Sequence, residues 1–168
     1  MVNAFKTLAL GFMTISFVAC GIYSFTGGNT GDAKTIQIDF FQNQAPIIEP
    51  TLSLRFTQDL QDLFTRQTNL TLVNNNGELH FEGEIVDYRI NPMSATANQT
   101  AAQNRLTIVV NVIYTNNLEE ENSFEKQFSF YHDYGASEQL SGSVLEAALD
   151  EILERLTQDI FNASVANW

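Results

Sequence analysis

Glu82 and Glu84 are the two residues whose type and spacing most resemble a catalytic pair. Because they lie two positions apart on a predicted strand, their side chains share one face, and paired carboxylates can serve a hydrolase as general acid and base. Same-face carboxylates are far more common as a solvated strand surface. A cavity that joins the two side chains would favour an envelope hydrolase, whereas exposure on a flat strand would exclude one.

The remaining polar residues do not define a metal centre or a catalytic nucleophile. His80 is predicted to face outward from its strand and His132 to be a strand-end aromatic, and two histidines so far apart need added ligands to bind a metal. Glu119–Glu121 is predicted to be a solvated turn, and Ser141 and Ser143 lie at a predicted helix start. We therefore predict no catalytic residue, no metal ligand and no cofactor, and hence no enzyme.

Cys20 is the only cysteine, and its surroundings predict a modification for it. It lies between Ala19 and Gly21, after a mostly apolar run that is preceded by the single positive charge of Lys6. This layout is typical of a lipoprotein signal, which is cleaved before a cysteine that then carries lipid, although Phe17 replaces the usual Leu. An ordinary secretory signal is the alternative. A stop-transfer helix is disfavoured because the run is shorter than the roughly 20 apolar residues that span a bilayer.

Lipidation of Cys20 would anchor the chain, because two or three acyl chains such as palmitate hold a protein at a membrane far more firmly than one. No Asp follows Cys20 and no acidic run does, so the expected location is the outer membrane, on the periplasmic side. We predict a signal peptide over residues 1–19, a lipid anchor and flexible linker over residues 20–33, and a single domain over residues 34–168.

The composition is strongly acidic and rich in phenylalanine. A formal net charge of −12 and the lack of a basic cluster disfavour binding to nucleic acid or to an anionic membrane surface. The 13 Phe residues indicate an aromatic core.

Hydrophobic periodicity predicts two amphipathic helices and four to five strands. The helices are expected over Pro50–Gln67 and after a capping box at Ser143 and Glu146. The strands are expected at Thr35–Phe41, Leu70–Val73, Leu79–Ile90, Leu106–Tyr114 and Phe124–Tyr134. A change of apolar phase in the third of these predicts a β-bulge, which we place at Gly83. The predicted fold is an α+β two-layer sandwich, with two helices on one face of a four- to five-stranded, mostly antiparallel sheet.

Five parts of the sequence share features with a known family. They are Cys20–Phe25, Phe81–Ile85, Asn104–Ile108, Asp159–Asn162 and Trp168. Together they resemble the lipopolysaccharide-assembly lipoprotein family LptE, in its Bacteroidetes-type branch, and the resemblance extends over the mature chain. It implies a two-helix-on-sheet fold without catalysis. It also implies a role as plug and assembly partner of the LptD β-barrel, with which the family places lipopolysaccharide in the outer leaflet.

The predicted loop Asn91–Asn104 is our candidate for contact with such a barrel. It is uncharged and longer than a hairpin needs, and barrel interiors are polar, so it could enter one at little desolvation cost. A plain surface loop is the alternative. Arg105 at its exit could pair with a barrel carboxylate, a lipid phosphate or a nearby Glu. The predicted partner-binding residues are Asn91, Pro92, Met93, Ser94, Thr96, Asn98, Gln99, Thr100, Gln103 and Arg105.

The acidic composition favours a protein partner over direct binding of lipopolysaccharide, which remains an alternative ligand. A second hypothesis is an outer-membrane lipoprotein that faces the periplasm and binds an apolar small molecule or envelope component. An apolar pocket would support it. Its expected lining residues are Phe40, Phe81, Phe128 and Phe130.

Overall fold

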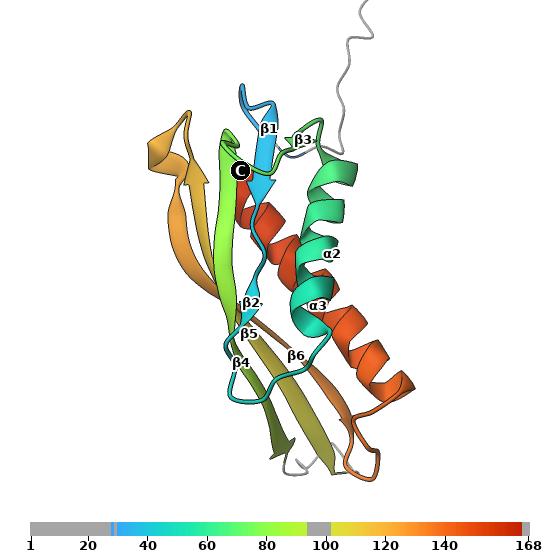
Figure 1. The fold of residues 1–168 in the computed structure, drawn as a ribbon. Helices are drawn as coiled ribbons and strands as arrows, with labels where there is room; N and C mark the ends of the chain where they lie inside the picture. Colours follow the sequence, from blue (N-terminus) through green and yellow to red (C-terminus); the bar gives the residue numbers. More distant parts are fainter. Residues whose placement is uncertain (1–27, 29, 94–101, 166–168) are drawn as a thin grey trace, which may run out of the picture.

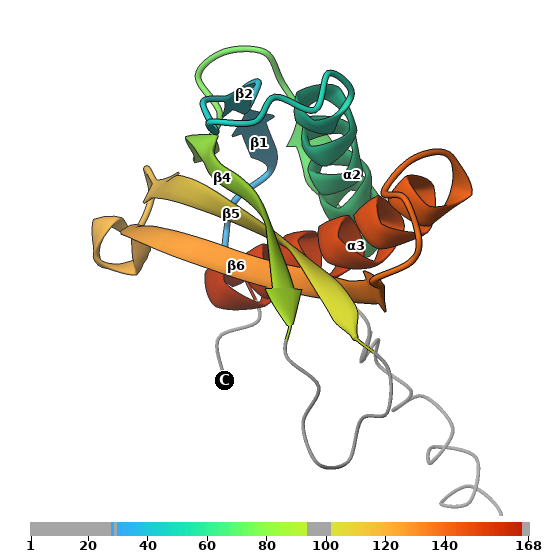
Figure 2. The same cartoon turned by 90° about the horizontal axis from the view of Figure 1, so that it is seen from below.

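Two amphipathic helices cover one face of a twisted sheet in the computed structural model, which describes residues 28, 30–93 and 102–165 (Figure 1). The elements along the chain are β1 (Thr35–Ile38), β2 (Gln42–Asn43), α2 (Leu52–Gln67), β3 (Thr71–Leu72), β4 (Leu79–Met93), β5 (Gln103–Asn116), the 3₁₀ turn η2 (Glu120–Asn122), β6 (Phe124–Gly135) and α3 (Ser143–Val165). The view from below shows both helices on the same side of the sheet (Figure 2). The predicted α+β two-layer arrangement is confirmed.

The sheet is six-stranded and mixed, so the expected strand number and pairing need correction. Its order is β3-β1-β4-β5-β6, and β2 also pairs with β4. Strands β4, β5 and β6 form the antiparallel meander that the alternating segments predicted. The other pairs are parallel: β1 pairs with β3 and with β4, and β2 pairs with β4. Parallel pairing requires a long connection between the strands, and α2 provides it between β2 and β3.

The predicted β-bulge exists, but it lies three residues beyond Gly83. The pairing between β4 and β5 is regular through Ile85 and shifts between Ile85 and Asp87, which makes Val86 the extra residue. Gly83 serves packing instead. A β-carbon at this position would lie 2.1 Å from the carbonyl oxygen of Asn111 and 2.7 Å from the ring of Phe41, so the missing side chain lets that ring approach the strand.

Both helices present the apolar faces that the sequence predicted, with differences at their starts. All five apolar residues predicted for the face of α2 are buried: Leu52, Phe56, Leu60, Leu63 and Phe64. Helix α2 begins at Leu52 with Thr51 as its N-cap, so Pro50 precedes the first turn. The capping box is wrong, because Gly142 accepts the first helical hydrogen bond of α3 and the carboxylate of Glu146 pairs with Arg55.

An aromatic cluster joins the two layers. The ring of Phe64 on α2 lies 5.0 Å from Phe81 on β4 and 5.0 Å from Phe161 on α3, measured between ring centroids. Phe81 in turn lies 4.7 Å from Tyr114 on β5. Burial raises the pKa of the Tyr114 phenol to about 12, as expected for a hydroxyl in this dry layer. The helices are therefore bound to the sheet by side chains that exclude water.

Candidate partner-binding surface

The predicted loop is shorter than expected because both flanking strands continue into it. Met93 of β4 pairs with Gln103 of β5, and Pro92 pairs with Asn104. Pro92 is tolerated here because this end of β4 has no neighbour on its other side among the described strands. The predicted contact residues Ser94, Thr96, Asn98, Gln99 and Thr100 lie outside the described residues.

The described contact residues gather at one end of the sheet, which we call the β4–β5 tip. It consists of Asn91, Pro92, Met93, Gln103 and Arg105. Figure 1 shows this end of β4 and β5 projecting past α2 and β2. Asn91 and Pro92 are exposed, and the other three are half-buried. The tip is therefore a largely polar end of the sheet, with β6 beside β5 and an accessible backbone edge on β4.

Arg105 is held by a neighbour rather than presented to solvent. Its guanidinium donates two hydrogen bonds to the carboxylate of Asp133 on β6, at 2.7 and 2.8 Å, and lies 3.6 Å from the ring centroid of Tyr131. The hydrogen bonds from Arg105 lower the pKa of Asp133 and outweigh partial desolvation, which acts in the opposite direction. Of the three partners considered for Arg105, the structure shows a nearby carboxylate, but this belongs to Asp133 rather than to a Glu.

Each arginine in the described part of the chain has a partner of this kind. Besides Arg105, the pairs are Arg55 with Glu146 and Asp150, Arg66 with Asp62, Arg89 with Asp87, and Arg155 with the ring of Phe130. The described surface consequently offers no cluster of uncommitted arginines to a phosphate group. This agrees with the acidic composition.

The carboxylates of Glu82 and Glu84 do not form a catalytic site. Both are exposed on the face of β4 opposite the helices, where Glu82 pairs across the strands with Ile113 and Glu84 with Asn111. Neither lines the 510, 390, 370 or 320 Å³ cavities found among the described residues. Exposure on an open strand excludes the hydrolase hypothesis.

The apolar pocket of the second hypothesis is also missing from the described residues. Phe81 and Phe128 belong to the buried core, whereas Phe40 is exposed and borders a 370 Å³ surface hollow with Leu54 and Leu72. Phe130 is half-buried against the core. The four rings therefore do not line a common cavity.

The two histidines lie on opposite faces of the sheet. The contact of His80 with Asp39 was not predicted from the sequence. His132 pairs with Glu151 of α3, with Nδ1 2.7 Å from the carboxylate. His80 faces outward, as predicted, but its Nε2 lies 2.9 Å from the carboxylate of Asp39, just beyond β1. Asp39 is 41 residues from His80, and no local pattern links them. Only the parallel register of β1 and β4 brings them together.

Cys20 lies outside the described residues, so its lipidation stays a prediction. Within the described part, neither helix combines the length and the apolar character that a membrane span requires.

The fold and surface thus define a one-sided α+β domain with a polar tip and without a catalytic site among its described residues. The chain belongs to the LptE lipopolysaccharide-assembly family, whose sequence model matches residues 33–164. This membership makes it a non-enzymatic assembly lipoprotein of the outer membrane. The match does not separate branches of the family, so the Bacteroidetes-type assignment stays a prediction. No curated protein matches the chain.

Solved structures support the fold. The hypothetical protein CT253 from Chlamydia trachomatis is similar with a TM-score of 0.55 at 8% identity, over 80% of this chain and 99% of that one. A minor lipoprotein from Acinetobacter baumannii is similar with a TM-score of 0.51 at 13% identity, over 80% of this chain and 92% of that one. At these identities the likeness concerns the fold alone.

Proposed function

We propose that this chain is anchored through Cys20 on the periplasmic side of the outer membrane and acts as plug and assembly partner of an LptD-like β-barrel. In this role it takes part in transport of lipopolysaccharide to the outer leaflet. The observation that carries the proposal is the family match over residues 33–164, which includes every described strand and nearly all of α3. The absence of a catalytic arrangement among the described residues is consistent with it.

The β4–β5 tip is the part of the domain that we assign to the barrel. It extends past α2 and β2 (Figure 1). It carries amides and backbone groups, and its one charged residue, Arg105, is paired with Asp133. Such a surface suits a polar barrel interior, because an uncharged group loses less solvation than an ion when it leaves bulk water. We assign residues 94–101, which connect the two strands in the sequence, to the same contact.

Contact with the barrel rather than with lipopolysaccharide phosphates is supported by the state of the arginines. Arg105 in the tip is paired with Asp133, and Arg89, two residues before the tip on β4, is paired with Asp87. Binding a phosphate would require breaking such a pair, which exposes an unpaired acid beside the lipid anion. Repulsion between this carboxylate and the phosphate would therefore weaken direct binding of lipopolysaccharide.

The test is a pull-down of the lipidated protein from solubilised outer membrane, with mass spectrometry of the proteins recovered. We expect one large β-barrel protein in near-equal amount. Recovery of the lipoprotein alone, in detergents mild enough to preserve other barrel complexes, would contradict the proposal.

A pair of matched variants tests the tip itself. Asn98→Lys with Gln99→Lys adds two charges between β4 and β5, while Asn74→Lys with Asn75→Lys adds two charges to the exposed turn at the opposite end of β4. We expect the first variant to lose barrel recovery at least tenfold and the second to retain it. Equal recovery with both variants would remove the tip from the interface.

A further inference from the structure

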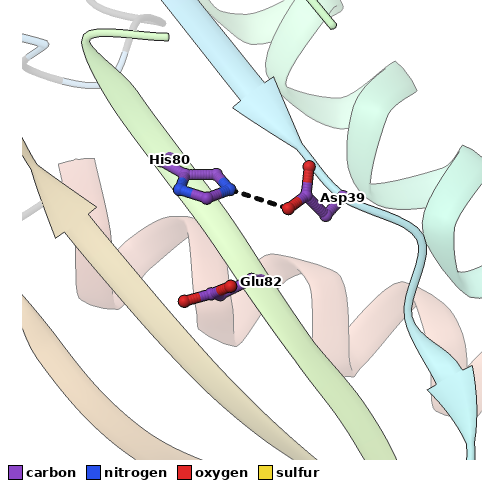
Figure 3. A group of neighbouring side chains, drawn as sticks. All are labelled: Asp39, His80 and Glu82. Carbon is purple, nitrogen blue, oxygen red and sulfur yellow. Dashed lines mark hydrogen bonds and ion pairs between the residues drawn. The ribbon is translucent and has the colours of Figure 1, made fainter. Parts of the chain in front are cut away.

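Asp39, His80 and Glu82 bring three metal-ligating side chains together on the uncovered face of the sheet (Figure 3). One ligand atom from each lies within 4.8 Å of the other two. The set does not come from one local segment, because Asp39 follows β1 whereas His80 and Glu82 belong to β4. The backbone fixes the junction between them, since the amide of Asp39 donates to the carbonyl of Phe81 at 2.9 Å.

The spacing of the first two ligands matches that of ligands on one ion. Nε2 of His80 lies 2.9 Å from Oδ2 of Asp39. Zinc binds nitrogen and oxygen at about 2.0–2.2 Å, so two ligands about 90–110° apart are separated by roughly 2.9–3.5 Å. The carboxylate of Glu82 lies within 4.8 Å of the other two ligand atoms, and because the side chain is exposed, other rotamers are open to it.

Polar neighbours hold the His80 ring and the Asp39 carboxylate side by side. Nε2 of His80 lies 2.9 Å from the Asp39 carboxylate and 3.1 Å from the side-chain amide nitrogen of Gln37. The Gln37 amide donates to Oδ1 of Asp39 at 2.8 Å, which leaves Oδ2 facing the imidazole. A protonated Nε2 donates to this oxygen, whereas an unprotonated Nε2 presents its lone pair to a cation at the same point.

A cation bound to Nε2 takes the place of the proton that the ring otherwise donates to Asp39. Asp39 then approaches a positive charge, and Gln37 keeps its hydrogen bond to the far oxygen of Asp39. Such an outer contact commonly orients a ligating carboxylate. The exposed Glu84 on the same face and the net charge of −12 also attract cations to this surface.

We propose that Asp39, His80 and Glu82 bind a divalent transition-metal ion, with Zn²⁺ as the best match to one imidazole and two carboxylates. Water completes the coordination. The ion links the end of β1 to β4 and so stabilises the parallel pairing of these two strands. This proposal does not depend on the barrel partnership.

Titration of the full lipoprotein in detergent with Zn²⁺ alone tests it, using protein without a histidine tag that has first been stripped with a chelator. We expect one equivalent to bind and the melting temperature to rise with zinc concentration. His80→Asn should weaken binding at least tenfold. The matched control is His132→Asn, because His132 also pairs with a carboxylate but belongs to no three-ligand group among the described residues. Retained binding in His80→Asn, or equal loss in both variants, would overturn the proposal.

NMR of the unmodified chain tests the same site without a substitution that could disturb folding. The chain has 2 histidines, so their ring signals can be followed separately by NMR. We expect one equivalent of Zn²⁺ to shift the ring signals of His80 and to leave those of His132 unchanged. Shifts of both rings, or of neither, would overturn the site.

Discussion

The two faces of the sheet are built from alternate residues of the same strands, yet their environments are opposite. Phe81 is fully buried against rings from α2 and β5, while the next residue, Glu82, is exposed beside His80 and Asp39. The helix-covered face holds the layers together by excluding water. The uncovered face is held by polar and ionic pairs and stays available to ligands. We therefore expect stability to depend on the first face and binding on the second.

The largest expected difference is between two adjacent residues of β4. Phe81→Ala should lower the free energy of unfolding by about 4 kcal/mol, because it removes a buried ring and leaves a cavity between the layers. Glu82→Ala should change it by less than about 0.5 kcal/mol, as for an exposed residue. Urea denaturation of both variants measures this difference. Similar losses in the two would mean that the faces are not energetically distinct.

A smaller loss of stability is expected from a substitution at Gly83 of β4. Gly83→Ala places a methyl group against the carbonyl oxygen of Asn111 and the ring of Phe41, and overpacking of this kind costs about 2 kcal/mol. Its control, Glu84→Ala, alters the opposite face and should be nearly neutral. Urea denaturation of the two variants distinguishes a packing effect at Gly83 from a loss of stability that any substitution in β4 would cause. An unchanged unfolding midpoint for Gly83→Ala would show that Phe41 is free to withdraw.

The Arg105–Asp133 ion pair on the uncovered face should make a contribution to stability that depends on pH. Because the pKa of Asp133 is lowered in the folded state, its pairing stabilises the fold above the ordinary Asp pKa, and this contribution is lost as the pH falls through the lowered value. Arg105→Gln should lower the urea midpoint at pH 6, and the difference from the unmodified chain should shrink below about pH 4. A difference that is constant with pH would assign the effect to packing on Tyr131.

The smallest expected effect is a gain in stability at Asp59, which lines a hollow between α2 and α3. Partial burial raises the pKa of Asp59 despite nearby arginines, so its ionisation costs stability as the pH rises above the ordinary Asp pKa, and the cost is complete above the raised value. Asp59→Asn should therefore stabilise the protein at pH 7 by less than about 0.5 kcal/mol, and the gain should vanish in acid. Thermal melts of this variant and of the unmodified chain at the two pH values check this. Destabilisation at pH 7 would contradict it.

The sequence predicted the covered face better than the uncovered one for a physical reason. Burial of one face imposes a local period, so the apolar stripe of α2 and the alternation of β5 could be recognised without knowledge of pairing. The change of phase in β4 was visible too, but several residues could have absorbed it, and Gly83 was the wrong choice. Val86 carries no turn-forming signal that would have marked it.

Features that depend on which strands become neighbours could not be predicted in this way. Parallel pairing of β1 with β4 depends on the path of α2, and the cluster around His80 depends on that pairing. The ends of β4 and β5 were assigned to a loop from the sequence because their residues, such as Asn91 and Asn104, are polar. In the structure both residues belong to strands, where Asn91 pairs with Arg105 and Asn104 pairs with Pro92. The family resemblance did indicate the class of protein, and the family match confirmed it.

The most direct test of the central claim is site-specific photo-crosslinking in living cells. A photoreactive residue at Met93, on the β4–β5 tip, should crosslink to one large outer-membrane β-barrel protein. The same residue at Asn75, at the opposite end of β4, should give no such product. Crosslinking from Asn75 with none from Met93, or no barrel product from either position in correctly lipidated protein, would contradict the assignment of the tip as the barrel-binding end.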